Sequence, residues 1–292
     1  TLLKENIWKT WIKGLICAFL SLSFLVVIVY SSYRLISGYV SGKKDKVSFE
    51  SLSEMMPIFP VQVGGVVEST PQARDANATT EPTPFHGTEA DDEHSDENKP
   101  IMLEQFQTLS AINSDICGWL YIPSVDINYP VMWTPEDPEY YLRRDFYGND
   151  SRSGTPFVGE QCDVNSDCLL IYGHNMKNDT MFSKLDSFDD YEFWKNNPLM
   201  MFNTCYEKRV YRVFAAVTCS LSENDAEGFQ FYQYSGDMTE EEFVQLRDWL
   251  LSHAAYDTSD APEYGDQILI VSTCSYYTDD GRFLIAAYRT PD

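Results

Sequence analysis

The chain has 292 residues, and its 45 acidic and 21 basic side chains give a formal net charge of −24 at pH 7. This balance argues against a nucleic-acid-binding protein, because phosphate contacts need clustered lysine and arginine. The length allows one sizeable domain with appendages, or two small domains. The four histidines show no zinc-site spacing, and no CxxC pair occurs among the seven cysteines, which are Cys17, Cys117, Cys162, Cys168, Cys205, Cys219 and Cys274.

A run of 20 uncharged residues, 14–33, lies near the amino terminus and is rich in Leu, Phe, Val and Ile. As a helix it would span about 30 Å, the thickness of a bilayer core. A cleaved signal peptide is the alternative, but the run is long for one and no clear cleavage site follows. We therefore predict a short cytoplasmic segment over 1–13 and a single-pass transmembrane anchor over 14–33. Basic residues flank both sides, so the positive-inside rule leaves the orientation open.

Residues 34–100 are predicted to form a juxtamembrane segment followed by a disordered acidic spacer. Between 66 and 100 there are nine acidic and two basic side chains, with repeated Pro, Thr and Ala. Such a segment cannot bury enough apolar surface to offset its ordering entropy. Residues 47–65 are more apolar, which indicates weak structure or a position near the membrane. The folded domain is then predicted over 101–292.

This domain begins with an amphipathic helix, because Leu103, Phe106, Leu109 and Ile112 recur at helical spacing. Thr239 with Glu242 forms a capping box that predicts a second helix over 239–253. Short apolar segments elsewhere predict strands over 118–122, 127–132, 155–158, 168–172, 209–217, 268–271 and 282–288. Closely spaced strands with few helices favour a mostly antiparallel sheet closed into a barrel.

The candidate chemistry lies around residues 268–282. Cys274 follows one predicted strand, Arg282 begins the next, and Asp-Asp-Gly at 279–281 is a strong reversal signal. If the strands pair, the thiol and the guanidinium face one opening, where a cation lowers the thiol pKa and stabilises an oxyanion. His174 follows the strand over 168–172 through Gly173 and supplies a candidate base. This arrangement suits acyl transfer.

Several residues have simpler interpretations. A lone cysteine is usually a small core residue, and we expect this of the other five in the domain; the spacing of Cys162 and Cys168 leaves a disulfide or metal pair open. Cys274 differs because hydroxyl side chains surround it. Arg289 is seven residues from Arg282 and therefore points to the opposite face, as a surface or salt-bridged group. His253 ends the 239–253 helix, where we expect it to interact with the helix's negative end.

These motifs together resemble the signature of the sortases, the membrane-anchored cysteine transpeptidases of Gram-positive bacteria. The signature consists of Ser272-Thr-Cys274, Arg282 eight residues later, and Tyr172-Gly-His-Asn175. The resemblance covers nearly all of 101–292, and the anchor and spacer match it too. Class B in particular is indicated by 118–123, 128–131, 140–142, 145–148, 153–154, 173–178 and 181–182, and by the helix near 239–253. Ile270-Val271 replaces the usual Thr-Leu and leaves the reactive residues intact.

The resemblance implies an eight-stranded sortase-type β-barrel that requires no metal or cofactor. It implies that Cys274 cleaves a carboxy-terminal sorting motif of secreted surface proteins after threonine and forms a thioacyl-enzyme. His174 would be the general acid and base, Arg282 would stabilise the oxyanion, and Ser272 and Tyr276 would contact substrate. The acceptor would be the amine of a peptidoglycan precursor or, in a pilus-building variant, a pilin lysine. The catalytic domain would lie outside the cell membrane.

Two other functions compete with this interpretation. A hydrolytic cysteine peptidase shares the chemistry, but papain-like enzymes place Cys before His, and the Gln-Ala-Cys motif of caspase-like enzymes is absent. A non-catalytic, tethered surface or pilus-scaffold protein would carry an unreactive Cys274.

Overall fold

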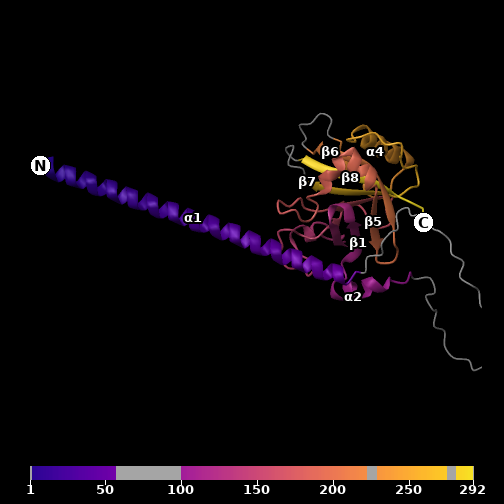
Figure 1. The fold of residues 1–292 in the computed structure, drawn as a ribbon, viewed down its shortest axis with the longest axis horizontal. Coiled ribbons are helices and arrows are strands. Elements are labelled where there is room, and N and C mark those ends of the chain that lie inside the picture. The colour runs from indigo at the N-terminus through magenta and orange to yellow at the C-terminus, as the bar shows by residue number, and fades with distance from the viewer. Residues whose placement is uncertain (1, 57–99, 222–228, 275–280, 292) are drawn as a thin grey trace, which may run out of the picture.

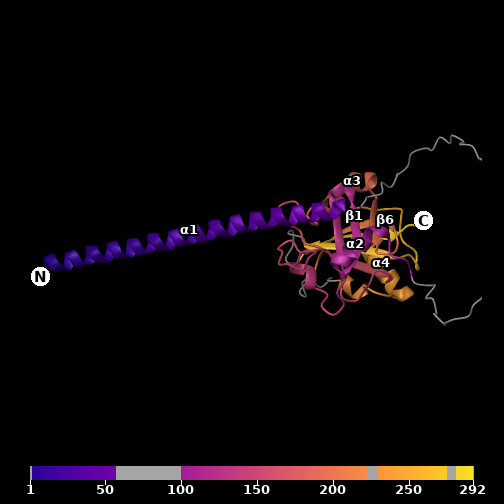
Figure 2. The same cartoon turned by 90° about the horizontal axis from the view of Figure 1, so that it is seen from below.

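A long helix and a β-barrel make up the computed structural model, which describes residues 2–56, 100–221, 229–274 and 281–291. Helix α1 (Leu2–Glu54) extends away from the barrel (Figures 1 and 2). The other helices are α2 (Glu104–Ile112), α3 (Tyr191–Asn196) and α4 (Glu240–Ser252). The strands are β1 (Ile116–Ile122), β2 (Ile127–Met132), β3 (Phe157–Val158), β4 (Cys168–Tyr172), β5 (Leu199–Thr204), β6 (Val210–Ser220), β7 (Ile268–Cys274) and β8 (Gly281–Arg289).

The eight strands close into a barrel in the order β1-β2-β3-β4-β7-β8-β6-β5, which confirms the predicted fold. The β2–β3 and β4–β7 pairs are parallel, and the other six are antiparallel. The parallel β4–β7 pair brings the carboxyl ends of two buried strands to the same edge. His174 lies two residues after the end of β4, and Cys274 is the last residue of β7.

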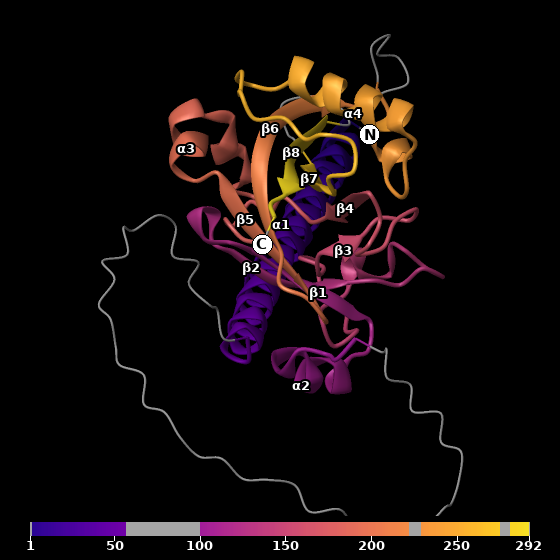
Figure 3. The same ribbon diagram turned by 90° about the vertical axis from the view of Figure 1, so that its right-hand side faces the viewer.

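Helix α4 packs on β6 through Phe243, Leu246 and Leu250, which are all buried. Its capping box is present as predicted. The Thr239 hydroxyl accepts from the Glu242 amide at 3.3 Å, and the Glu242 carboxylate accepts from the Thr239 amide at 2.8 Å. Helices α4 and α2 lie on opposite sides of the barrel (Figures 1 and 3).

Strand β5 is an element that the sequence did not predict. Its burial alternates along Leu-Met-Met-Phe-Asn-Thr, as in a strand with one face in the core. Phe202 and Thr204 favour a strand, but the two methionines are not among the strand-enriched residues and Asn203 is depleted in strands, so local propensity gave only a weak signal. Pairing with β1 and β6 on its two sides decides the conformation.

Helix α1 continues well past the predicted anchor, so residues 34–54 are helical. Within them, 47–54 belong to the segment for which the sequence indicated weak structure or a position near the membrane. The apolar window of this helix has a mean hydropathy of 2.4 and no buried residue, and by length and composition it could cross a membrane. Beyond it, Phe49 and Leu52 pack in a core cluster with Phe106 and Leu109 of α2. That packing holds the helix beyond the apolar run. Residues 57–99, with most of the predicted spacer, lie outside the described residues.

Candidate active site

A cavity of about 610 Å³ lies where β4, β7 and β8 meet, and Cys274, His174, Arg282 and Ser272 all line it. Cys274 is exposed at the end of β7, after six buried residues. It pairs with Arg282 in the antiparallel β7–β8 register. Directly opposed residues of antiparallel strands project on the same face, so the thiol and the guanidinium share one side of the sheet.

Hydrogen bonds between the ends of β4 and β7 fix the position of His174. The Thr273 hydroxyl donates to the Gly173 carbonyl at 2.8 Å, and the Asn175 side-chain amide donates to the Cys274 carbonyl at 2.9 Å. The residues on both sides of His174 are therefore bonded to the end of β7. This brings the histidine to the cysteine although 99 positions separate Asn175 from Cys274.

The imidazole of His174 is supported from the other wall of the cavity. Its Nε2 lies 2.8 Å from the Leu142 carbonyl. A carbonyl only accepts, so Nε2 carries the proton and Nδ1 is the basic nitrogen of the neutral ring. Burial lowers the pKa of His174, the Leu142 carbonyl opposes that effect, and the nearby positive charge of Arg143 lowers the pKa further. Neutral imidazole is thereby favoured, as a base requires.

Ser272 lies at the floor of the cavity and is fully buried. Its hydroxyl has no hydrogen-bond partner among the described residues. Buried hydroxyls normally find a partner, so Ser272 is an exception among the described residues. Tyr276, the other predicted substrate contact, lies outside the described residues.

The remaining candidates lie away from the cavity. Arg289 pairs with Glu207 at the far end of β8, and the Nδ1 of His253 bonds the Trp249 carbonyl at 2.9 Å, as predicted for a helix end. Cys162 and Cys168 are both free thiols and are both buried, so they form no disulfide.

Cysteine environments differ sharply between Cys274 and the rest of the domain. Burial raises the pKa of Cys162, Cys205 and Cys219 to about 11. Burial likewise raises the pKa of Cys117 and the pKa of Cys168. Among the cysteines whose exposure is described, Cys274 is the one classed as exposed. Accessibility therefore favours Cys274 as the candidate nucleophile.

Sequence reasoning did not identify three supporting groups, namely the Leu142 carbonyl, the Thr273 hydroxyl and the Asn175 amide. Thr273 and Asn175 adjoin the candidate residues Cys274 and His174, so their polar side chains gave a weak signal. Leu142 gave none, because its contribution is a backbone oxygen placed by a distant loop. In the described part of the chain, His, Cys, Asp and Glu do not gather in groups of three that could hold a metal.

Comparison with known proteins settles the family. A model of the sortase domain matches residues 120–290, more than half of the chain. The chain belongs to the sortase family. Its relatives are class B sortases, and sortases of this class are cysteine transpeptidases, so this protein is an enzyme of that kind.

Two class B relatives illustrate the similarity. Sortase B of Staphylococcus aureus is 24% identical over 272 residues, which cover 90% of this chain and 92% of that protein. Sortase B of Listeria monocytogenes is 27% identical over 193 residues, which cover 62% of this chain and 72% of that protein.

Solved sortase B structures share the barrel. The Bacillus anthracis sortase B complex with AAEK1 is 28% identical, covers 65% of this chain and 86% of its own, and gives a TM-score of 0.57. A substrate complex of Staphylococcus aureus sortase B, at 24% identity, also has a TM-score of 0.57 and supports the fold.

Proposed function

We propose that this sortase cleaves a carboxy-terminal sorting motif of secreted surface proteins after threonine and transfers the acyl group to an amine of a cell-wall precursor. The observation that carries the proposal is the convergence of Cys274, His174 and Arg282 on one cavity. A nucleophile, a base and a fixed cation in one opening are the parts that acyl transfer needs.

In the first half of the reaction, His174 takes the thiol proton and the Cys274 sulfur attacks the threonine carbonyl carbon. Arg282 stabilises the negative oxygen of the tetrahedral intermediate. The carbon–nitrogen bond then breaks, and His174 gives its proton to the leaving amine. The product is a thioester between the threonine and Cys274, and the downstream peptide departs.

In the second half, the acceptor amine attacks the thioester carbon, and His174 removes a proton from the amine nitrogen. The carbon–sulfur bond breaks, and His174 returns the proton to the departing sulfur, which regenerates the Cys274 thiol and the neutral imidazole. The Ser272 hydroxyl, buried and without a partner among the described residues, is suited to hold the motif beside the nucleophile. Tyr276 is a second proposed contact.

We also propose that α1 anchors the enzyme in the cell membrane by a single pass, with the barrel outside. The apolar side chains over 14–33 whose exposure is described are solvent-exposed in the isolated chain, as a lipid-facing helix requires. Anchoring raises the effective concentration of membrane-retained substrates and acceptors at the cavity.

The test is a trapping experiment on the full chain in detergent micelles, since α1 contributes to the core and should be kept. A library of sorting-motif peptides is offered with a panel of amines, and mass spectrometry follows the acyl-enzyme and the transfer product. Cys274→Ala should abolish the adduct. An adduct that persists in that variant would refute the nucleophile assignment.

The same experiment compares the two arginines. Loss of one oxyanion donor costs roughly a hundredfold to a thousandfold in turnover, and we expect Arg282→Ala to fall in that range. Arg289→Ala is the matched control on the same strand, and its turnover should stay near that of the wild type. The reverse ranking would overturn the role given to Arg282. The preferred amine distinguishes a cell-wall acceptor from a pilin lysine.

A further inference from the structure

A second cavity, of about 420 Å³, lies between α1 and a loop of the barrel, on a surface that the reaction does not use. It opens directly beyond the apolar run, which ends at Tyr33. Its lining comes from two distant parts of the chain, namely Tyr33, Arg34 and Ser37 of α1 and Arg143, Asp150, Ser151 and Arg152 of the barrel.

The contact between helix and loop is close and specific. A Cβ atom added at Gly38 would lie 2.9 Å from the Arg152 guanidinium, so the arginine side chain reaches the helix backbone at this glycine. Two turns on, the buried Asp45 carboxylate accepts hydrogen bonds from the hydroxyls of Ser151 at 3.0 Å and Ser153 at 2.9 Å. The loop that carries Arg152 is therefore held against the helix.

Positive charge dominates this cavity, in contrast to the net −24 of the whole chain. Arg34, Arg143 and Arg152 are exposed, and among the described residues none of them pairs with a carboxylate. Arg143 donates one hydrogen bond, to the Arg152 carbonyl at 3.1 Å, which joins two residues of the cavity lining. Asp150 is the one carboxylate in the lining, so the charges sum to about +2.

The position of the cavity along the axis of α1 matches the headgroup region of a membrane. Arg34 to Gly38 lie about 1.5 to 7.5 Å beyond Tyr33 along the helix axis, at 1.5 Å per residue. The headgroup region on each side of a bilayer is roughly 5 to 8 Å thick. If the apolar run spans the hydrocarbon, the three guanidinium groups lie at the level of lipid phosphates, which their planar donor forks fit well.

We propose that this cavity binds the phosphate of an anionic phospholipid headgroup and so holds the barrel against the membrane beside its own anchor. The proposal rests on the membrane anchoring proposed above. Its consequence reaches the active site, because Arg143 directly follows Leu142, whose carbonyl supports His174. A bound headgroup would fix that loop and keep the catalytic cavity near membrane-retained substrates.

The test uses the full chain in nanodiscs of phosphatidylcholine, alone or mixed with phosphatidylglycerol. Native mass spectrometry measures which lipids stay bound when the protein is released from the nanodisc. Hydrogen exchange measures the protection of residues 143–152. The wild type should retain phosphatidylglycerol preferentially and show added protection in its presence. Each arginine at an anionic surface contributes a factor of roughly 5, so Arg143→Gln with Arg152→Gln should reduce the preference roughly 25-fold.

The matched control removes two positive charges elsewhere, with Lys195→Gln on α3 and Arg247→Gln on α4, and should keep the preference. The proposed site would be overturned if both double variants lost the phosphatidylglycerol preference equally, or if Arg143→Gln with Arg152→Gln did not lose it. The same protection produced by inorganic phosphate in phosphatidylcholine discs would also overturn it. Thermal unfolding in those discs verifies that each variant is folded. If the wild-type protein dissociates from both kinds of disc, the proposed membrane anchoring is wrong. If it stays in the discs but shows no preference for phosphatidylglycerol, only the proposed headgroup site is wrong.

Discussion

His174 illustrates how single residues are tuned by their surroundings. Burial disfavours the charged imidazolium, and the positive charge of Arg143 acts in the same direction, so the pKa lies below its ordinary value of 6.5. The Leu142 carbonyl stabilises the protonated form and opposes both. The imidazole is then neutral above its lowered pKa, and the base catalysis proposed for His174 should be lost as the pH falls through that value.

We therefore predict that Arg143→Gln raises the pKa of His174 and moves the acidic limb of the aminolysis rate to higher pH. The reason is that one of the two effects that disfavour imidazolium is removed. Titration of the His174 ring signal by NMR measures the pKa, and its assignment comes from the signal lost in His174→Ala. Lys195→Gln, which removes a distant charge, should leave the titration unchanged. A downward shift in Arg143→Gln would contradict the assignment.

At the scale of elements, α1 serves as both a candidate membrane span and part of the folded domain. Its docked face repeats every three or four residues through Gly38, Gly42, Asp45, Phe49 and Leu52, which places them on one side of the helix. The two glycines allow close approach, the aspartate is bonded, and the apolar residues are buried. The barrel is thus attached to a continuous helix.

Asp45→Ala should weaken this attachment by about 1–3 kcal/mol, because two buried hydroxyls lose their acceptor. We expect faster hydrogen exchange over residues 45–54, together with a lower thermal midpoint. The control is Glu50→Ala on the same helix, whose exposed pair with Lys46 at 4.0 Å contributes little. Similar exchange in the two variants would show that Asp45 does not hold the helix.

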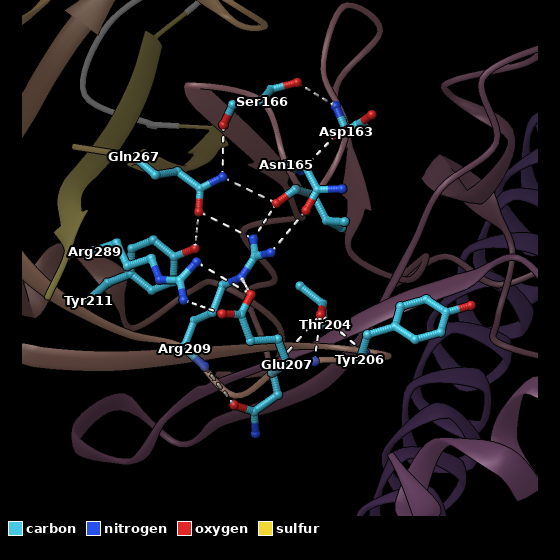
Figure 4. A network of polar contacts seen from close by, with 12 residues as sticks. Asp163, Asn165, Ser166, Thr204, Tyr206, Glu207, Arg209, Tyr211, Gln267 and Arg289 are labelled. Carbon is cyan, nitrogen blue, oxygen red and sulfur yellow. Dashed lines mark hydrogen bonds and ion pairs between the residues drawn. The ribbon is translucent and has the colours of Figure 1, made fainter. Parts of the chain in front are cut away.

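At the scale of the whole molecule, a polar network closes the barrel at the end opposite the active site (Figure 4). The Arg209 guanidinium, almost fully buried, donates to the Val164 carbonyl, to Asn165 at 2.9 Å, to Gln267 at 3.2 Å and to Glu207 at 2.8 Å. These bonds join the β5–β6 turn to the loop before β4 and the start of β7. The network and the proposed catalytic residues therefore lie at opposite ends of the same strands.

Arg209→Ala should lower the free energy of unfolding by about 3–5 kcal/mol, because it leaves buried partners unsatisfied. Urea denaturation followed by tryptophan fluorescence measures this. Below the unfolding transition, kcat/KM should stay within about twofold of the wild type, since Cys274 and Arg282 lie at the other end of β7 and β8. Arg247→Ala, at an exposed pair with Asp248, should change stability by less than about 1 kcal/mol. Loss of activity without loss of stability would contradict the separation.

The sequence alone determined what depends on neighbouring residues. The apolar run over 14–33, the Thr239 capping box and the strands around Cys274 are local patterns, and the sortase motifs identified the residues that meet in one cavity. Only the tertiary structure decided β5, the docking of α1, the Leu142 contact with His174 and the arginine-lined cavity. Each of these depends on groups brought together from distant parts of the chain, and side-chain periodicity carries no information about such contacts.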